Sequence, residues 1–320
     1  MKIGFDSALG INVGFGHFKR CIAIANILAD LSYEIDFVIP SAKYSVLVDK
    51  EKFKIRRCFR KVDNYDIIFT DRYDLDEFIL ASYNKICNKL IRIDDSESKL
   101  KTDRFSDVII NGNPYGKEET YRGRVRNDCL LLVGPDYIPM DKNFCFARNK
   151  YKIRTKVKQI LITFGASAKG VIFGREICRM ISDSNTNEGS MILKGKRPEQ
   201  TGSIIVKFVP FTEKIYDVFS DSDIAVCSSS STCWQLAAVG VPFITFMTAQ
   251  NQSAAFDHVQ LRKIGIALQQ EAIKNGRLLD TINTLTYDQR QKYSLRGRRV
   301  IDCKGAQRIV KKLHELILCS

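Results

Sequence analysis

The sequence predicts an α/β protein built from two domains, each with a mostly parallel sheet. The chain has 320 residues, more than a single hydrophobic core usually supports, so two domains of roughly 150 residues each are expected. Short apolar strands alternate with segments of helical period along most of the chain, which is typical of βαβ units. Both halves also share one plan, in which a strand leads into a Gly/Ser loop and the loop into a helix.

The composition is that of an ordinary folded protein, with 45% hydrophobic and 27% charged residues. A net charge of +14 would suit a nucleic acid, an anionic membrane surface or an anionic small substrate, and an AT-rich genome rich in lysine codons would also produce it. The basic residues are dispersed, and no nucleic-acid-binding motif is present. We therefore expect no nucleic-acid partner, and the charge itself decides little.

The ten cysteines are scattered, without a CxxC pair and without metal-ligand spacing beside the three histidines. This favours reduced, structural thiols in a cytoplasmic protein and predicts no metal and no cofactor. The first residues, Met1 to Asp6, carry an early acid and no long apolar stretch, so they are expected to form a strand and not a signal peptide. No run approaches the ~20 apolar residues of a membrane span. A monomer is favoured.

In the first half, a strand at 3–6 is followed by a glycine-rich loop at 10–16 and a helix that starts at His17. In that helix Ile22, Ala25, Leu28 and Leu31 recur at helical spacing. Further strands are expected at 34–40, 65–69, 89–93 and 108–110, with a helix at 74–88. The first domain is predicted to cover residues 1–145.

Residues 137–158 are polar and basic, contain Pro139 and show no clear period, so the interdomain connection is placed there. The second domain is predicted to cover residues 146–320, and its last helix can pack back on the first domain. Its strands are expected at 159–164, 190–193, 204–209, 224–226 and 243–246. Its helices are expected at 171–182, 213–220, 231–239, 252–263 and 306–318.

The loop Gly14-Phe15-Gly16-His17 opens the first helix directly after a strand. Open parallel sheets bind ligands at the carboxyl ends of their strands, and two such sheets facing each other would line one cleft. Glycines let the backbone approach a ligand, and a helix N-terminus favours the neutral ring of a general base such as His17. Alternatively, His17 only caps the loop. Neither GxGxxG phasing nor a GK[ST] ending is present.

The second half offers matching loops. The segment Gly165-Ala166-Ser167 suits a diphosphate approached by backbone amides, but it also suits a routine strand-to-helix connection. Four serines at 228–231 and a threonine at 232 precede a helix. They form either a phosphate or sugar cradle, with Gln235 one turn later on a sugar diol, or a solvated loop in which Ser231 is the N-cap.

Polar residues also follow other strands. Asn251 and Gln252 begin a helix and carry amides that suit sugar hydroxyl or acetamido groups. Asp94 and Asp95 end one strand of the first half, and Asp71 with Tyr73 ends the strand before. Such acids can position water, sugar or a metal, and they are equally good helix caps. None forms a convincing DxD metal site.

Ten motifs follow one another along the chain: Gly14-x-Gly16-His17-x-x-Arg20-Cys21, Asp71-x-Tyr73-x-Leu75-Asp76, Ile93-Asp94-Asp95, Asn111-Gly112-Asn113, Leu132-Val133-Gly134-Pro135-Asp136-Tyr137, Thr163-Phe164-Gly165-Ala166-Ser167, Asp221-Ser222-Asp223-Ile224-Ala225, Ser231-Thr232-Cys233-Trp234-Gln235, Asn251-Gln252 and Lys304-Gly305-Ala306-Gln307-Arg308. In this order they resemble the UDP-sugar hydrolases of pseudaminic acid biosynthesis over nearly the whole chain. The second half alone is also similar to the peptidoglycan N-acetylglucosaminyl transferases, which have the GT-B architecture.

The resemblance implies a GT-B-like fold and a metal-independent hydrolase, with the catalytic loop and the sugar side in the first domain and the nucleotide bound by the second. In this reading His17 activates a water that attacks the anomeric carbon of a UDP-linked 2,4-diacetamido-trideoxy hexose, so that UDP leaves with inversion. The substrate would be the UDP-sugar, in nonulosonic acid biosynthesis. The implied diphosphate and nucleotide residues are Gly14, Gly16, Gly165, Ala166, Ser167, Val209, Phe211, Ser230, Ser231, Thr232 and Gln235. The implied sugar residues are Asp6, Arg20, Tyr73, Asp94, Asn251 and Gln252.

The chain departs from the family pattern at three places. It has Ser230-Ser231-Thr232 where Gly-Ser-Thr is usual, Gln235 where a glutamate usually meets the ribose, and no arginine near Gly4. Losing a charged acceptor at Gln235 weakens that hydrogen bond. Two alternatives therefore stay open beside the hydrolase. One is a GT-B glycosyltransferase that uses a non-water acceptor, and the other is a non-catalytic homologue that binds nucleotide-sugars.

Overall fold

The computed structural model describes residues 1–10, 15–39, 41–95, 100–165, 167–184, 190–192, 205–210 and 214–318. The chain divides into two compact units. The first comprises Met1–Lys142 together with Cys303–Ser320, and the second comprises Asn143–Asp302. The chain therefore passes from one unit to the other twice. The boundary expected at residue 145 lies inside helix α3 (Lys142–Lys150), three residues beyond the division.

The first unit contains a seven-stranded sheet in the order β3-β2-β1-β4-β5-β6-β7, and every pairing is parallel. The chain starts at the centre with β1, moves outward to β3, and then returns to place β4 on the other side of β1. The order thus reverses between β1 and β4, which is where open α/β sheets bind their ligands. The strands are β1 (Lys2–Ser7), β2 (Glu34–Val38), β3 (Lys54–Arg56), β4 (Tyr65–Asp71), β5 (Cys87–Ile93), β6 (Val108–Asn111) and β7 (Leu130–Val133).

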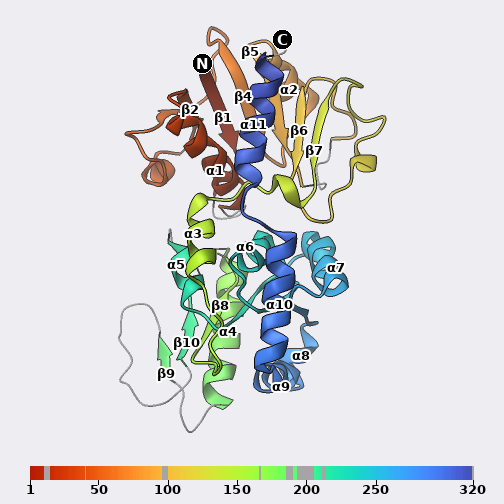
Figure 1. Ribbon diagram of the computed structural model, residues 1–320. Coiled ribbons are helices and arrows are strands. Elements are labelled where there is room, and N and C mark those ends of the chain that lie inside the picture. Colours follow the sequence, from red (N-terminus) through yellow and green to blue (C-terminus); the bar gives the residue numbers. More distant parts are fainter. Residues whose placement is uncertain are drawn as a thin grey trace. The chain divides into compact units, whose positions relative to one another are not determined.

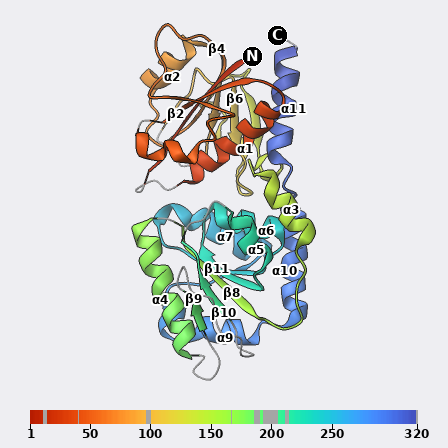
Figure 2. The ribbon, with the colours of Figure 1, turned by 90° about the vertical axis from the view of Figure 1, so that its left-hand side faces the viewer.

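Helices cover both faces of this sheet (Figures 1 and 2). Helices α1 (Gly16–Asp30) and α11 (Gly305–Leu318) pack on one face and against each other, and α2 (Glu77–Asn84) packs on the other. The core under α1 includes the stacked rings of Phe5, Phe37 and Phe69. Short 3-10 turns are η1 (Ala42–Leu47), η2 (Glu118–Thr120) and η3 (Pro135–Tyr137).

The start of α11 is packed closely against the segment after η3. A Cβ atom on Gly305 would lie 2.2 Å from the carbonyl oxygen of Ile138, and one on Gly112 would lie 2.6 Å from the Cα of Ile138. Both positions therefore require glycine, because backbone meets backbone there. These contacts seat the last helix in the first unit.

The second unit contains a six-stranded parallel sheet in the order β13-β12-β11-β8-β10-β9. Its strand order reverses between β8 and β11, so the loops that follow these two strands share the ligand-binding position of the sheet. The strands are β8 (Gln159–Thr163), β9 (Ser190–Ile192), β10 (Ile205–Phe208), β11 (Ile224–Ser228), β12 (Phe243–Phe246) and β13 (Ile266–Ala267).

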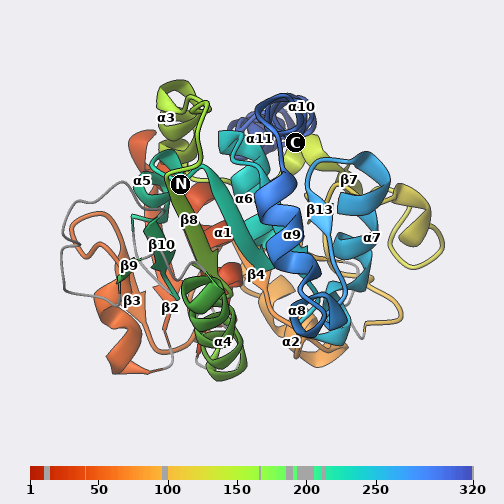
Figure 3. The same cartoon turned by 90° about the horizontal axis from the view of Figure 1, so that it is seen from below.

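Figure 3 separates α4, α8 and α9 on one side of this sheet from α5, α6 and α10 on the other. Residues of α4, α8 and α9 join the core cluster of β8 and β11, while α10 packs on α6. Besides α3, the helices are α4 (Ala168–Ser184), α5 (Ile215–Ser220), α6 (Ser231–Val239), α7 (Ser253–Arg262), α8 (Glu271–Lys274), α9 (Arg277–Thr284) and α10 (Tyr287–Val300), with η4 (Gln250–Gln252) before α7.

The prediction of two parallel-sheet α/β domains is confirmed, but several elements differ from expectation. The helix expected at 74–88 is only α2, because Cys87 and Asn88 already belong to β5. Helix α10 was not predicted. Its buried residues are Arg290, Ser294 and Gly297, so no apolar stripe marks it in the sequence. Among the helices of the described residues, none combines the length and the apolar character that a membrane span requires.

Candidate functional site

The first site residue, His17, lies in the first turn of α1 and is 6% exposed. Its Nδ1 atom is 2.6 Å from Oδ1 of Asp71, the last residue of β4. Because α1 follows β1 and Asp71 ends β4, the pair sits where the strand order of the first sheet reverses. Neighbouring strands therefore bring together two residues that are 54 positions apart in the chain.

Arg20, one turn after His17, completes this cluster. Its Nε atom donates to Oδ2 of Asp71 at 3.0 Å and its Nη2 atom to Oδ1 at 2.8 Å. Nη2 also lies 2.9 Å from Nδ1 of His17. A guanidinium only donates, and Nδ1 cannot accept from it while donating to Asp71. The 2.6 Å contact with an ionised carboxylate favours donation to Asp71, which leaves Nε2 as the proton-accepting nitrogen of the neutral ring.

Asp71 stays ionised although it is buried. Burial by itself would raise the pKa of its carboxyl, but the charge of Arg20 and the hydrogen bonds from His17 and Arg20 hold that pKa below its ordinary value. Arg20 is held as a cation in turn. Burial opposes its charge, yet Asp71 and Asp95 raise the pKa of the guanidinium above its usual range. The cluster thus contains a fixed negative charge directly behind the imidazole.

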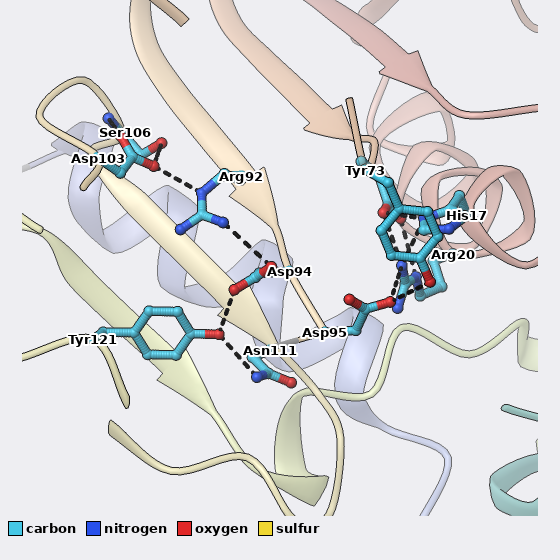
Figure 4. Close-up of polar contacts among 11 residues, drawn as sticks. His17, Arg20, Tyr73, Arg92, Asp94, Asp95, Asp103, Ser106, Asn111 and Tyr121 are labelled. Carbon is cyan, nitrogen blue, oxygen red and sulfur yellow. Dashed lines mark hydrogen bonds and ion pairs between the residues drawn. The ribbon is translucent and has the colours of Figure 1, made fainter. Parts of the chain in front are cut away.

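Tyr73 lies against His17, and Asp95 lies beside Tyr73 and Arg20 (Figure 4). The ring of Tyr73 meets that of His17 edge to face, with centroids 4.4 Å apart and planes at 87°. The Tyr73 hydroxyl donates to Oδ2 of Asp95 at 2.9 Å, and the same oxygen is 3.8 Å from Nη2 of Arg20. Tyr73 is 37% exposed and the side chain of Asp95 16%, so both are open to solvent.

Two members of the predicted sugar set lie elsewhere. The side chain of Asp94 points away from His17 into a buried network, where it pairs with Arg92 and accepts from the Tyr121 hydroxyl at 2.8 Å. Asp6 is the next-to-last residue of β1 and is 1% exposed, and its carboxylate accepts from Arg72 at 2.9 Å and from the Tyr83 hydroxyl. Neither carboxylate is placed to meet a ligand from solvent. Arg20 and Tyr73 do lie at the His17 cluster.

In the second unit, the serine-rich loop follows β11, on one side of the switch point. Ser230 is the N-cap of α6, whereas Ser231 is its first, exposed residue; the alternative in which Ser231 caps the helix is therefore wrong. Buried Ser228 pairs with Ser230 at 3.0 Å, and buried Ser229 with Thr245 at 2.9 Å. These pairs fix the conformation of the loop that leads into α6. Thr232, which is half-buried, lies in the first turn of this helix, and a helix N-terminus favours anions.

The loop after β8 lies on the other side of that switch point. Gly165 has a φ of +76° with open space where a Cβ would stand, so glycine is needed for the turn and not for packing. The Ser167 hydroxyl accepts from the backbone N–H of Gly170 at 3.2 Å and thereby caps the start of α4. Val209 follows β10 and is half-buried.

The remaining predicted residues are more peripheral or are not described. Gly16 begins α1 and is exposed, and Gln235 is half-buried on α6. Asn251 is exposed, while the side-chain oxygen of Gln252 accepts from the backbone N–H of Thr248 at 2.8 Å. Gly14, Ala166 and Phe211 lie outside the described residues. Nowhere in the described part of the chain do three or more His, Cys, Asp or Glu side chains gather as metal ligands.

Two residues of the cluster were not in the predicted site set. The sequence indicates Asp71 and Asp95 as strand-end acids and as members of two motifs of the resemblance, but it predicts a sugar contact for Asp94 and none for these two. Side chains alternate between the two faces of a strand only as far as the strand continues. Past its end, the sequence pattern therefore does not show which of two adjacent acids points toward the site. The strand order identifies Asp71, because β4 lies directly beside β1.

Comparison with known proteins supports the fold and indicates distant relatives. No protein-family profile matches the chain. The spore coat polysaccharide biosynthesis protein SpsG of Bacillus subtilis is 22% identical over 346 aligned residues, covering 99% of this chain and 98% of SpsG. The UDP-2,4-diacetamido-2,4,6-trideoxy-beta-L-altropyranose hydrolase of Campylobacter jejuni is 24% identical over 153 residues, covering 45% of this chain and 53% of that protein.

Solved structures match the chain along its whole length. MurG of Acinetobacter baumannii superposes with a TM-score of 0.62 at 12% identity, covering 98% of this chain and 99% of MurG. The calicheamicin glycosyltransferase CalG4 gives the same TM-score and identity, covering 98% of this chain and 97% of CalG4. The chain therefore has the two-domain α/β fold of the GT-B glycosyltransferases.

Proposed function

We propose that the protein processes a nucleotide-sugar and that His17, oriented by Asp71, is its general base. The observation that carries this proposal is the 2.6 Å contact between Nδ1 of His17 and Oδ1 of Asp71. With Nδ1 occupied, Nε2 is the nitrogen that takes a proton, and the ionised carboxylate stabilises the imidazolium that forms. Tyr73 and Asp95, which are open to solvent beside the ring, are the groups available to a sugar.

We further propose that the nucleotide belongs to the second unit. The loops after β8 and β11, with Gly165, Ser167 and the Ser230–Thr232 segment, flank the switch point of that sheet, where phosphate groups usually bind. UDP is favoured as the nucleotide because the relative in Campylobacter jejuni is a hydrolase of a UDP-sugar. The half-buried Gln235 would then meet the ribose through an amide instead of the carboxylate implied by the resemblance.

The reaction proposed first is hydrolysis. Nε2 of His17 removes a proton from water, the oxygen bonds to the anomeric carbon, and the bond from that carbon to the UDP oxygen breaks. UDP leaves from the opposite face, so the configuration inverts. The substrate is proposed to be a UDP-linked 2,4-diacetamido-trideoxy hexose, in nonulosonic acid biosynthesis of the pseudaminic type. The motif order along the chain and the name of the hydrolase relative support this choice.

The second candidate is transfer of the sugar to a hydroxyl other than water, with His17 removing the proton of that hydroxyl. Two observations favour it. The relative that spans the whole chain carries the name of a polysaccharide biosynthesis protein, and the solved structures of the same fold include glycosyltransferases. The chemistry at His17 is the same in both candidates, and only the acceptor differs.

Product analysis separates the two candidates. The protein is incubated with a panel of UDP-sugars that includes the 2,4-diacetamido sugar, and the anomeric configuration is followed by NMR. Free inverted sugar together with UDP supports hydrolysis, whereas release of UDP only in the presence of an added acceptor supports transfer. No UDP release under either condition would overturn the enzyme assignment.

Substitutions test the base. His17→Asn and Asp71→Asn should each lower kcat by at least about 100-fold, the usual contribution of an oriented general base. His314→Asn is the matched control, because His314 bonds Tyr33 on the face covered by α11 and should leave kcat unchanged. Near-full activity of His17→Asn would remove the imidazole from the mechanism.

A further inference from the structure

A buried polar network holds the end of β5, next to the His17 cluster (Figure 4). Its central residue, Asp94, is tied in three ways. Its backbone N–H donates to the carbonyl of Ile110 at 2.8 Å, its Oδ1 atom is 3.2 Å from Nη1 of Arg92, and its Oδ2 atom accepts from the hydroxyl of Tyr121. Asp94 therefore has almost no freedom to shift.

The network is itself braced on both sides. Nε of Arg92 donates to Asp103 at 2.7 Å, and the Ser106 hydroxyl donates to the same carboxylate at 2.7 Å. On the other side, the Asn111 amide donates to the hydroxyl of Tyr121 at 2.8 Å. Arg92, Asp103 and Tyr121 are 4%, 1% and 3% exposed. A buried ion pair adds little net stability compared with apolar packing, but it does supply fixed geometry.

We propose that this network positions Asp95 and, through Asp95, the ring of His17. Asp95 follows Asp94 directly, so the ties on Asp94 fix the backbone from which the Asp95 carboxylate extends. That carboxylate holds the Tyr73 hydroxyl at 2.9 Å, and the ring of Tyr73 lies edge to face on His17. In this proposal Tyr121 and Arg92 are positioning residues, which act on His17 through Asp94, Asp95 and Tyr73. The proposal rests on the proposed function only in treating His17 as the base.

Tyr121→Phe tests the proposal because it removes a single buried hydroxyl. The matched control is Tyr65→Phe. Tyr65 is 1% exposed, and its hydroxyl donates to the buried carboxylate of Asp36 at 2.7 Å. Asp36 lies on β2, and strands β1 and β4 lie between β2 and β5. The readout is the ring-proton NMR resonances of the three histidines at one fixed pH. The signals of His17 respond to the position of the Tyr73 ring through its ring current.

The expected result is that Tyr121→Phe moves the His17 signals and leaves those of His258 and His314 in place, while Tyr65→Phe moves none of the three. Unchanged His17 signals in Tyr121→Phe would overturn the proposal, as would equal shifts in both variants. If Tyr121→Phe does not fold, Arg92→Lys is judged by the same criteria, because one ammonium cannot reproduce the fork between Asp94 and Asp103.

Kinetics add a second readout. Displacement of the base should lower kcat by about 10-fold or more in Tyr121→Phe while KM changes little, because misplacement of a catalytic group acts mainly on the chemical step. A rise in KM with kcat unchanged would contradict a positioning role. If the unmodified protein turns over no UDP-sugar, the proposed function fails, whereas the NMR comparison still decides whether the network positions His17.

Discussion

At the scale of single residues, the burial of Asp71 conflicts with the charge that its role requires. It is 1% exposed, which disfavours its charge, and yet the orientation of His17 depends on that charge. Arg20 resolves the conflict, since its bidentate contact supplies an opposite charge and two donors to the same carboxylate. Arg20→Lys would lose the planar fork and leave one donating nitrogen in place of the two that bind the two oxygens of Asp71.

The lowered pKa of Asp71 predicts a dependence of stability on pH. A carboxyl whose pKa is lower in the folded than in the unfolded protein stabilises the fold above its unfolded pKa, and that contribution is lost as the pH falls through the folded pKa. Chemical unfolding measured between neutral pH and pH 3 should therefore show the free-energy gap between the unmodified protein and Asp71→Asn shrinking as the pH falls.

Asp128→Asn provides the comparison. Asp128 also has a lowered pKa, from its hydrogen bond with Arg126, but it is exposed to solvent, so its contribution is screened. The gap for Asp128→Asn should change much less over the same range. Parallel curves for the unmodified protein and Asp71→Asn would contradict the assignment of Asp71 as a buried, ionised partner of Arg20.

The sequence could locate His17, Arg20 and Tyr73 but not the acids that bind them. The glycines at 14 and 16 mark the loop and the start of the helix, and they place the histidine in the first turn. Which of the acids at 71, 94 and 95 lies in the His17 cluster depends on the strand order and on the direction in which the chain continues after each strand. Both are decided by tertiary packing, which local periodicity does not encode.

At the scale of elements, α6 joins the proposed nucleotide loop to the core. Its N-cap residue, Ser230, closes the first turn, and its apolar residues from Cys233 to Val239 are buried against the sheet. Helix α10 packs on this helix and is seated by Arg290, which donates to the carbonyls of Arg154 and Thr155. Because its buried residues are not apolar, apolar residues at helical spacing do not mark this helix in the sequence, and the sequence pattern does not predict it.

Ser230→Ala should cost about 1 kcal/mol of stability, the usual value of an N-cap side chain. It should also weaken UDP binding, because the hydroxyl belongs to the proposed cradle. Thr286→Ala removes the N-cap of α10, including a capping box, and should cost a similar free energy without changing the affinity for UDP. Thermal unfolding and calorimetric titration with UDP measure the two effects, and equal UDP affinities in both variants would exclude Ser230 from the nucleotide site.

The junction at the start of α11 gives a second prediction at this scale. Gly305→Ala should destabilise the protein by about 3 kcal/mol, because its Cβ would lie 2.2 Å from a backbone oxygen that cannot move without shifting the segment after η3. Gly10→Ala is the control, since the nearest atom to its Cβ would be the Tyr44 hydroxyl at 3.7 Å. Unfolding in urea compares the two, and equal midpoints would show that the contact at Ile138 relaxes freely.

At the scale of the whole molecule, the two units have separate cores and different proposed roles. The first supplies the oriented base and the second the phosphate-binding loops. Hydrogen–deuterium exchange with UDP alone should therefore slow exchange in residues 228–235, where the helix N-terminus and the hydroxyls lie, while residues 65–71 of β4 keep their rates. Protection confined to the first unit would reverse the proposed assignment of the nucleotide.

The double passage of the chain between units also has a consequence for biosynthesis. The core of the first unit contains Ala306, Ile309, Val310 and Leu313 of α11, which leave the ribosome only after all of residues 143–302 have been made. The second unit is continuous in sequence, so it can complete its core while the first still waits for its last helix. The domain synthesised first is thus the one that matures last, and until then its uncovered α1 face is a surface for chaperones to protect.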